Sequence, residues 1–154
     1  VLERLWERCG YGLLIIVPGT PEYFQQLHIL RTRLIELKGH IVAPCGHQHA
    51  CLLQGGSHDW CHFSVRFDRS KALKHVKKAS VPWEDEKFSY LLATKKDFSC
   101  AQERILKKPR KYKFGIEFEI CDKGQNQSVF ISKRDKEKWA AVKNKTWGDL
   151  WNLN

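Results

Sequence analysis

The sequence contains no methionine and no apolar run long enough to cross a membrane. Its longest aliphatic run covers residues 13–17, whereas a membrane-spanning helix needs about 20 apolar residues. No signal peptide is visible at the N-terminus, and without an initiator methionine we expect a processed or partial product. What remains is a chain of 154 residues, enough for a domain with its own apolar core.

Acidic residues are scarce relative to basic ones, with 17 Asp and Glu against 27 Lys and Arg. The formal net charge of +10 is large for this length and favours an anionic partner, above all nucleic acid. The alternative is a solvated basic face that only keeps the protein in solution. We expect the anionic partner.

Two runs concentrate the basic side chains. Residues 66–78 carry six Lys or Arg against one Asp, and residues 104–113 carry six against none. The side chains predicted to contact RNA are Arg66, Arg69, Lys71, Lys74, Lys77, Lys78, Lys107, Lys108, Arg110, Lys111 and Lys113. Trp83 and Tyr112 are expected to stack on unpaired bases, the alternative being that both rings pack in the core.

Apolar periodicity predicts helices and strands in alternation along the first part of the chain. Residues 1–9 read as a helix, and residues 11–19 as a strand that is apolar on both faces, as in a parallel sheet. The next helix has Thr20 as its N-cap, Pro21 in its first turn and Gly39 as its stop signal. Its expected buried stripe is Tyr23, Leu27, Leu30, Leu34 and Leu37.

The rest of the chain reads mainly as antiparallel strands. Strands are predicted over residues 40–44, 61–67, 86–96, 113–121 and 128–134, with a short basic helix at 70–78 and a closing helix and tail at 136–151. Phe114, Ile116, Phe118 and Ile120 are expected to point inward. The pattern indicates an α/β unit followed by a small antiparallel β extension.

Cysteines crowd one stretch of the chain. Cys45, Cys51 and Cys61 lie within residues 44–63, and Cys121 lies at a strand end from which it can supply a fourth thiolate. Four thiolates suit zinc or an iron–sulfur cluster, although the spacing matches neither a zinc ribbon nor a ferredoxin. Three disulfides are not expected, because Cys9 and Cys100 lie far from this stretch and a chain with a proper core needs none.

Two other interpretations of the cysteine stretch remain open. The thiols can be small buried apolar groups, or one of them can be a nucleophile activated by a neighbouring imidazole. The nearby histidines are His47, His49, His58 and His62. No third catalytic group or oxyanion hole is evident, so we expect these histidines to surround the site, to face RNA, or to compete as zinc ligands.

Several separate motifs resemble one known family. They are the "GTP" turn after a strand, "APC…C…WCHFSVR", "EDEKFSYL" and the "SKR…WGDLW" tail. The chain is similar over almost its whole length to the methyltransferase-like family of mitochondrial small-ribosomal-subunit proteins and assembly factors, which has bacterial relatives.

This resemblance implies a class I (Rossmann-like) methyltransferase-type fold, of which the chain forms the C-terminal half. Residues 1–98 would carry that half, including the metal loop at 44–63, and residues 99–154 a β-hairpin extension with the closing helix and tail. The resemblance also implies a [4Fe–4S] cluster, with Cys45, Cys51, Cys61 and Cys121 as its ligands and zinc as the alternative occupant.

The expected function is that of an iron–sulfur, rRNA-binding factor of the mitochondrial small ribosomal subunit, acting in its assembly or as a component, in the mitochondrial matrix. Its expected partners are small-subunit ribosomal RNA, mitochondrial ribosomal proteins and assembly factors, and no membrane. The Gly-rich turn and acidic ribose ligand of a S-adenosylmethionine site are absent, so we expect no bound S-adenosylmethionine and no catalysis by these residues alone. The alternatives are an rRNA methyltransferase whose cofactor-binding half lies upstream, and a zinc-binding nucleic-acid module.

Overall fold

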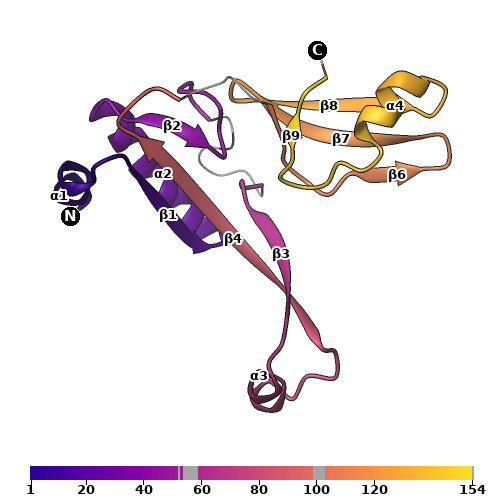
Figure 1. Ribbon diagram of the computed structural model, residues 1–154, viewed down its shortest axis with the longest axis horizontal. Coiled ribbons are helices and arrows are strands. Elements are labelled where there is room, and N and C mark those ends of the chain that lie inside the picture. The colour runs from indigo at the N-terminus through magenta and orange to yellow at the C-terminus, as the bar shows by residue number, and fades with distance from the viewer. Residues whose placement is uncertain (52, 54–58, 99–102, 154) are drawn as a thin grey trace.

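Two antiparallel sheets joined near the cysteine stretch form the protein (Figure 1). The structure, a computed structural model, describes residues 1–51, 53, 59–98 and 103–153. The first part contains α1 (Leu2–Arg8), β1 (Gly12–Pro18), α2 (Pro21–Glu36), β2 (His40–Ala43), β3 (Phe63–Asp68), α3 (Lys71–Val76) and β4 (Trp83–Thr94). The second contains β5 (Glu103–Ile105), β6 (Arg110–Tyr112), β7 (Gly115–Asp122), β8 (Gln125–Ser132), α4 (Lys136–Val142) and β9 (Leu150–Trp151).

Helix α2 begins as the sequence predicts but ends slightly earlier than expected. The Thr20 hydroxyl accepts a hydrogen bond from the backbone N–H of Tyr23, and Pro21 occupies the first turn. At the other end Lys38, rather than Gly39, adopts the left-handed conformation, with φ of 60°. Gly39 is needed for a different reason: a Cβ there would lie 2.8 Å from the Leu34 carbonyl oxygen.

The buried stripe of α2 differs from the predicted one. Phe24, Leu27, Arg31 and Leu34 are buried, whereas Tyr23 is exposed. The stripe is therefore rotated by one position at its start, and it includes an arginine that a purely apolar pattern passes over.

The first sheet has the order β1–β4–β2, with β3 pairing along the other part of β4. β1 and β2 both run antiparallel to β4 and so run parallel to each other, with α2 between them in the chain. The prediction that β1 pairs in a parallel sheet is therefore wrong: among the described residues its partner is the antiparallel strand β4. β4 lies between β1 and β2, the two strands that α2 connects. The coarser prediction, a mixed α/β protein with an antiparallel extension, is confirmed.

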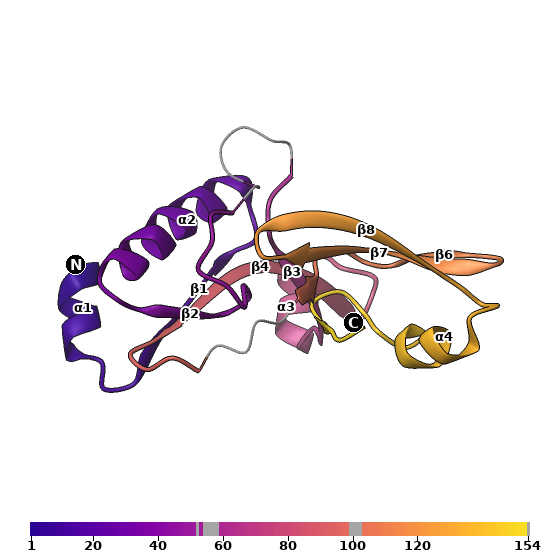
Figure 2. The ribbon, with the colours of Figure 1, turned by 90° about the horizontal axis from the view of Figure 1, so that it is seen from above.

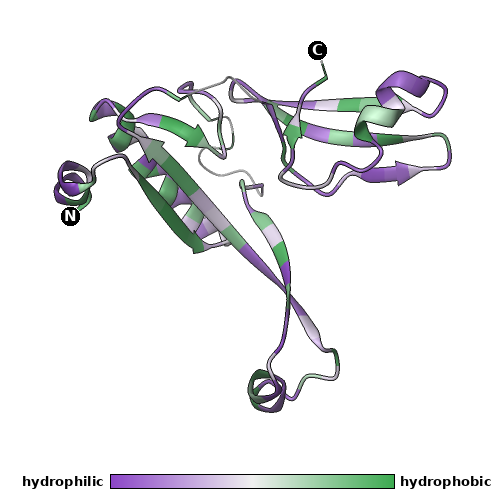
Figure 3. Cartoon of the chain, in the orientation of Figure 1, coloured by the Kyte–Doolittle hydropathy of each residue, from purple (hydrophilic) through white to green (hydrophobic). Residues whose placement is uncertain are grey.

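Helix α2 covers only one face of this sheet (Figure 2). Leu13 and Ile15 pack with Leu34 and Leu91 beneath the helix. On the opposite face the side chains of Leu14 and Ile16 are 55% and 62% exposed, and β1 is hydrophobic along its length (Figure 3). β1 is apolar on both faces, as predicted, but among the described residues only one face is buried.

Strand β3 and the first part of β4 form a long hairpin with α3 at its tip, residues 63–88, hereafter the arm (Figure 1). Its residues belong to neither apolar cluster of the described residues. Backbone pairing from Phe63 opposite Phe88 to Asp68 opposite Trp83 joins its strands, and charged side chains add to this pairing. Arg66 forms a two-pronged ion pair with Asp85, and Glu84 accepts from both Arg69 and Lys77.

The second sheet has the order β6–β7–β5–β9, with β8 pairing on β7. Its core contains Ile116, Phe118 and Ile120, as the alternation predicts, and Trp151, whose ring lies 4.9 Å from that of Phe118. Phe114 is 64% exposed, which corrects the prediction that it points inward, because β7 begins only at Gly115. No described helix is long and apolar enough to cross a membrane.

Two truncations on the same helix test this packing. Replacing the fully buried Leu34 with alanine should lower the free energy of unfolding by about 2–5 kcal/mol, since it leaves a cavity between α2 and the sheet. The same change at the exposed Ile29 should alter it by less than about 0.5 kcal/mol. Equal losses for L34A and I29A in urea unfolding would contradict the described packing.

Candidate metal centre and nucleic-acid interface

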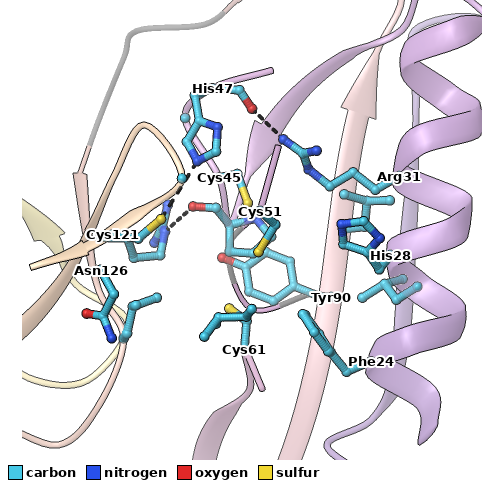
Figure 4. Close-up of a pocket in the computed structure, with 18 residues that line it drawn as sticks. Phe24, His28, Arg31, Cys45, His47, Cys51, Cys61, Tyr90, Cys121 and Asn126 are labelled. Atoms are coloured by element: carbon cyan, nitrogen blue, oxygen red, sulfur yellow. Dashed lines mark hydrogen bonds between the residues drawn. The ribbon is translucent and has the colours of Figure 1, made fainter. Parts of the chain in front are cut away.

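The four cysteines that the sequence singles out line one cavity, where the two sheets meet (Figure 4). Cys45 and Cys51 lie in the segment after β2, Cys61 lies just before β3, and Cys121 lies in β7. All four are half-buried free thiols. The cavity has an internal space of about 50 Å³, several times what a single buried water needs.

Burial in this cavity favours the neutral form of the thiols. It raises the pKa of Cys45 to about 11 and raises the pKa values of Cys61 and Cys121 as well. The neighbouring thiols add to these shifts, which places the four groups within electrostatic range of one another. A cation that binds here therefore has to displace protons from the thiols.

Arg31 binds the cysteine segment from α2. One guanidinium nitrogen donates hydrogen bonds to the backbone carbonyls of His47 and His49, each at 2.9 Å, and the side chain is buried. Its positive charge opposes the effect of burial on the pKa of Cys45. The charge faces the cavity without a carboxylate partner among the described residues, so the surroundings suit negative charge on sulfur.

Arg104 binds the same segment from the second sheet. Its Nε donates to the carbonyl of Pro44 at 2.6 Å, and another guanidinium nitrogen donates to the carbonyl of Gly148 at 2.7 Å. Arg104 is also the register partner of Cys121 across β5 and β7. The charge of Arg104 lowers the pKa of Cys61, against the effect of burial. Arg104 forms no ion pair with a carboxylate in the described part of the chain.

Three buried nitrogen atoms beside the thiols have no hydrogen-bond partner within the ranges described. They are Nε2 of His28, Nε of Arg31 and Nδ1 of His47, and all three side chains line the cavity. Buried polar atoms in folded proteins are nearly always paired, so these three indicate a partner that the described residues do not supply.

The four loop histidines divide among different environments. His47 is buried, and its Nε2 lies 3.7 Å from the sulfur of Cys121, whereas His49 is exposed. His62 stacks on Trp60, with ring centres 4.7 Å apart, and His58 lies outside the described residues. His47 is thus the histidine placed to interact with the thiol cavity.

No group of three or more Cys, His, Asp or Glu side chains in the described ranges is arranged to hold a single metal ion. The four thiols surround a space rather than closing on one point. Of the remaining cysteines, Cys9 donates a hydrogen bond to the carbonyl of Trp6, and Cys100 is outside the described residues.

The predicted RNA-contacting side chains fall into two groups. Those that form ion pairs with carboxylates are Arg66, Arg69, Lys77, Lys107 and Arg110. Those with no ion pair among the described residues are Lys71, Lys74, Lys78, Lys108, Lys111 and Lys113. Lys71, Lys74 and Lys78 cluster on and after α3 at the tip of the arm, and the other three lie on or beside β6.

The two aromatic residues predicted to stack on bases are both exposed, which removes the alternative that they pack in the core. Trp83 is 37% exposed, with the Arg66 guanidinium 3.7 Å above its ring. Tyr112 is 43% exposed, and its hydroxyl donates to Glu117.

A family model described as "Mitochondrial small ribosomal subunit Rsm22" matches residues 1–152. The chain belongs to the Rsm22 family. This confirms the resemblance drawn from the motifs and connects the chain with mitochondria, the small ribosomal subunit and translation. No curated protein matches it.

Arg31 and Arg104 are less evident from the sequence of this Rsm22-family chain than its cysteines are. Arg31 occupies a position four residues after Leu27 on the buried stripe of α2, and an arginine there is the one signal that a polar group enters the interior. Arg104 stands at the start of a basic run and is indistinguishable from its neighbours by sequence, because only strand pairing directs it toward Pro44.

Replacing Arg31 with methionine should loosen the cysteine segment of this Rsm22-family protein. The change leaves two backbone carbonyls without their donor and should cost about 2–4 kcal/mol of unfolding free energy. Amide hydrogen exchange should speed up at residues 45–51. Arg33→Met on the exposed side of the same helix is the control and should cost at most about 1 kcal/mol. Unchanged exchange in R31M would refute the role of Arg31.

Proposed function

We propose that this chain is an iron–sulfur-cluster-containing, rRNA-binding factor of the mitochondrial small ribosomal subunit, which acts in the matrix in assembly of the subunit or as a component of it. Its role is binding rather than catalysis. The observation that carries the proposal is the gathering of Cys45, Cys51, Cys61 and Cys121 around one cavity, beside two arginines that have no carboxylate partner among the described residues.

Charge balance supports a bound metal–thiolate group. The cavity is lined by four thiols, and burial raises the pKa values of Cys45, Cys61 and Cys121 among them. The positive charges of Arg31 and Arg104 lie beside these thiols. A cluster with four thiolate ligands is anionic, and the two guanidinium groups are placed to compensate that charge. The unpartnered nitrogens of His28 and Arg31, within the ranges described, add donors for sulfur acceptors.

The arrangement favours an iron–sulfur cluster over zinc. A single zinc ion brings its ligands to about 2.3 Å, so that four thiolates stand only about 3.8 Å from one another. No such close group occurs in the described part of the chain, and the four thiols line a cavity of about 50 Å³. A four-iron cluster takes one cysteine at each iron and accommodates ligands that stand farther apart.

When bound, the cluster would supply iron–thiolate bonds that hold the cysteine segment to β7. The chain's own residues already prepare this connection. Arg104 ties Pro44 to the second sheet, and Cys61 lies two residues before Phe63, the first residue of the arm. The cluster would therefore stabilise the position from which the arm extends.

The surface charge supports an RNA partner. The net charge of +10 suits phosphate groups, and so do the lysines on the arm and beside β6 that form no ion pair within the described ranges. RNA is also a principal component of the ribosomal subunit that the family description names.

Metal analysis of the anaerobically purified protein tests the cluster. The expected result is about four iron and four sulfide per chain, with brown absorbance. Cys51→Ser should lose the iron and the colour, whereas Cys9→Ser should retain both, because Cys9 lies outside the cavity.

One equivalent of zinc in place of iron and sulfide would overturn the cluster in favour of a zinc-binding nucleic-acid module. Full RNA binding by a cluster-free C51S protein would refute the connection between the cluster and the RNA surface.

A further inference from the structure

The structure has an open groove between the arm and the second sheet, with a volume of about 720 Å³. Arg66 and Asp85 line it from the arm, Lys108 and Lys111 from the segment at β6, and residues 143–147 from the turn after α4. Three stretches far apart in sequence thus form one surface, which is hereafter called the basic groove.

The basic groove has a strong excess of positive charge. Its cations are Arg66, Lys108, Lys111, Lys143 and Lys145, and Asp85 is its one carboxylate within the described residues. Arg66 is paired with Asp85, and Lys145 donates to the carbonyl of Leu150. Lys108, Lys111 and Lys143 are exposed and form no ion pair in the described part of the chain, so three ammonium groups remain available to a ligand.

Trp147 lines this surface with a ring and not with a free donor. Its indole Nε1 is buried from solvent and has no partner among the described residues. Because this N–H is closed to solvent, it is not open to a ligand in the groove. The groove therefore selects its ligand by the positive charge of its exposed lysines.

A planar cation completes the site. The Arg66 guanidinium lies 3.7 Å above the ring of Trp83, and the stacked pair is exposed at the edge of the groove. Bases of single-stranded nucleic acid stack on such guanidinium and aromatic surfaces. The side chains of a peptide made of acidic residues have no aromatic ring to stack on this surface, so the combination favours a nucleic acid.

We propose that the basic groove binds an unpaired segment of RNA, with backbone phosphates at Lys108, Lys111 and Lys143 and a base on the stacked surface of Arg66 and Trp83. This deepens the proposed function and rests on it, because it names the surface that takes ribosomal RNA. It assigns a role to Lys143, which does not belong to the basic runs evident from sequence.

The groove is also physically connected to the cysteine cavity. The ring of His62 meets Trp147 edge-on at 5.0 Å and stacks on Trp60 at 4.7 Å, and His62 and Trp60 flank Cys61. Arg104 binds the carbonyl of Gly148 and that of Pro44, the residues next to Trp147 and Cys45. The position of Trp147 thus depends on the segment that carries the thiols.

Fluorescence anisotropy with a labelled mixed-sequence single-stranded RNA of about 12 nucleotides tests the proposal on the anaerobically purified full chain. The double variant Lys111→Gln/Lys143→Gln should bind roughly ten-fold or more weakly. Its slope of log affinity against log salt should fall by about 0.7 for each phosphate group that the variant no longer neutralises. The charge-matched control is Lys96→Gln/Lys136→Gln, at exposed lysines outside the groove, which should keep the wild-type slope.

A second variant tests the stacking surface. Trp83→Leu removes the aromatic ring beneath Arg66, so it should weaken RNA binding roughly five-fold. Phe98→Leu is the control, because Phe98 is an exposed aromatic residue outside the groove, and it should bind as the wild type does.

The outcomes distinguish the groove from the proposed function. If the wild type binds RNA and the groove variants match their controls, the groove is not the RNA site, although an RNA-binding function stands. If the wild type binds no RNA, the function and the groove both fail. If polyglutamate binds as tightly as RNA at the same salt concentration and W83L changes neither, the groove is only a non-specific surface for polyanions.

Discussion

The position of Arg104 is the constraint on which the junction of the two sheets depends. Its strand position opposes Cys121, while its guanidinium reaches the carbonyls of Pro44 and Gly148. One side chain thereby sets the distance between the cysteine segment, the central strand of the second sheet and the C-terminal tail. A rigid, always-charged fork suits this task better than lysine, which presents a point charge on a flexible stem.

Positive charge has two separate roles in the molecule. Inside, Arg31 and Arg104 line the cavity, and their hydrogen bonds to backbone carbonyls fix the cysteine segment without neutralising the guanidinium charge. Outside, the arm keeps its shape through ion pairs such as Arg66–Asp85, while Lys71, Lys74 and Lys78 form none within the described ranges. Cationic side chains thus stabilise an interior cavity in one place and present charge to a partner in another.

The sequence predicted the positions of helices and strands more successfully than it predicted which segments pair or contact one another. Thr20 and Pro21 located the start of α2, and alternation located Ile116, Phe118 and Ile120, because these are local or period-two signals. The antiparallel pairing of β1 was missed, since apolar residues on both faces do not reveal strand direction. The four cysteines were identified by residue type, but their convergence on one cavity, the arginines beside it and the groove at Lys143 depend on contacts between distant segments.

The apolar face and edge of β1 bear on how the isolated chain behaves in solution. Leu14 and Ile16 are exposed on a seven-residue strand that pairs, in the described part of the chain, on one side only. Unpaired strand edges flanked by apolar side chains are where sheets of neighbouring molecules join, and they lead to aggregation. The net charge of +10 opposes this self-association by mutual repulsion, and salt screens that repulsion. High salt weakens the binding of a cationic protein to RNA. By screening the repulsion between molecules, it therefore also favours their association through the edge of β1.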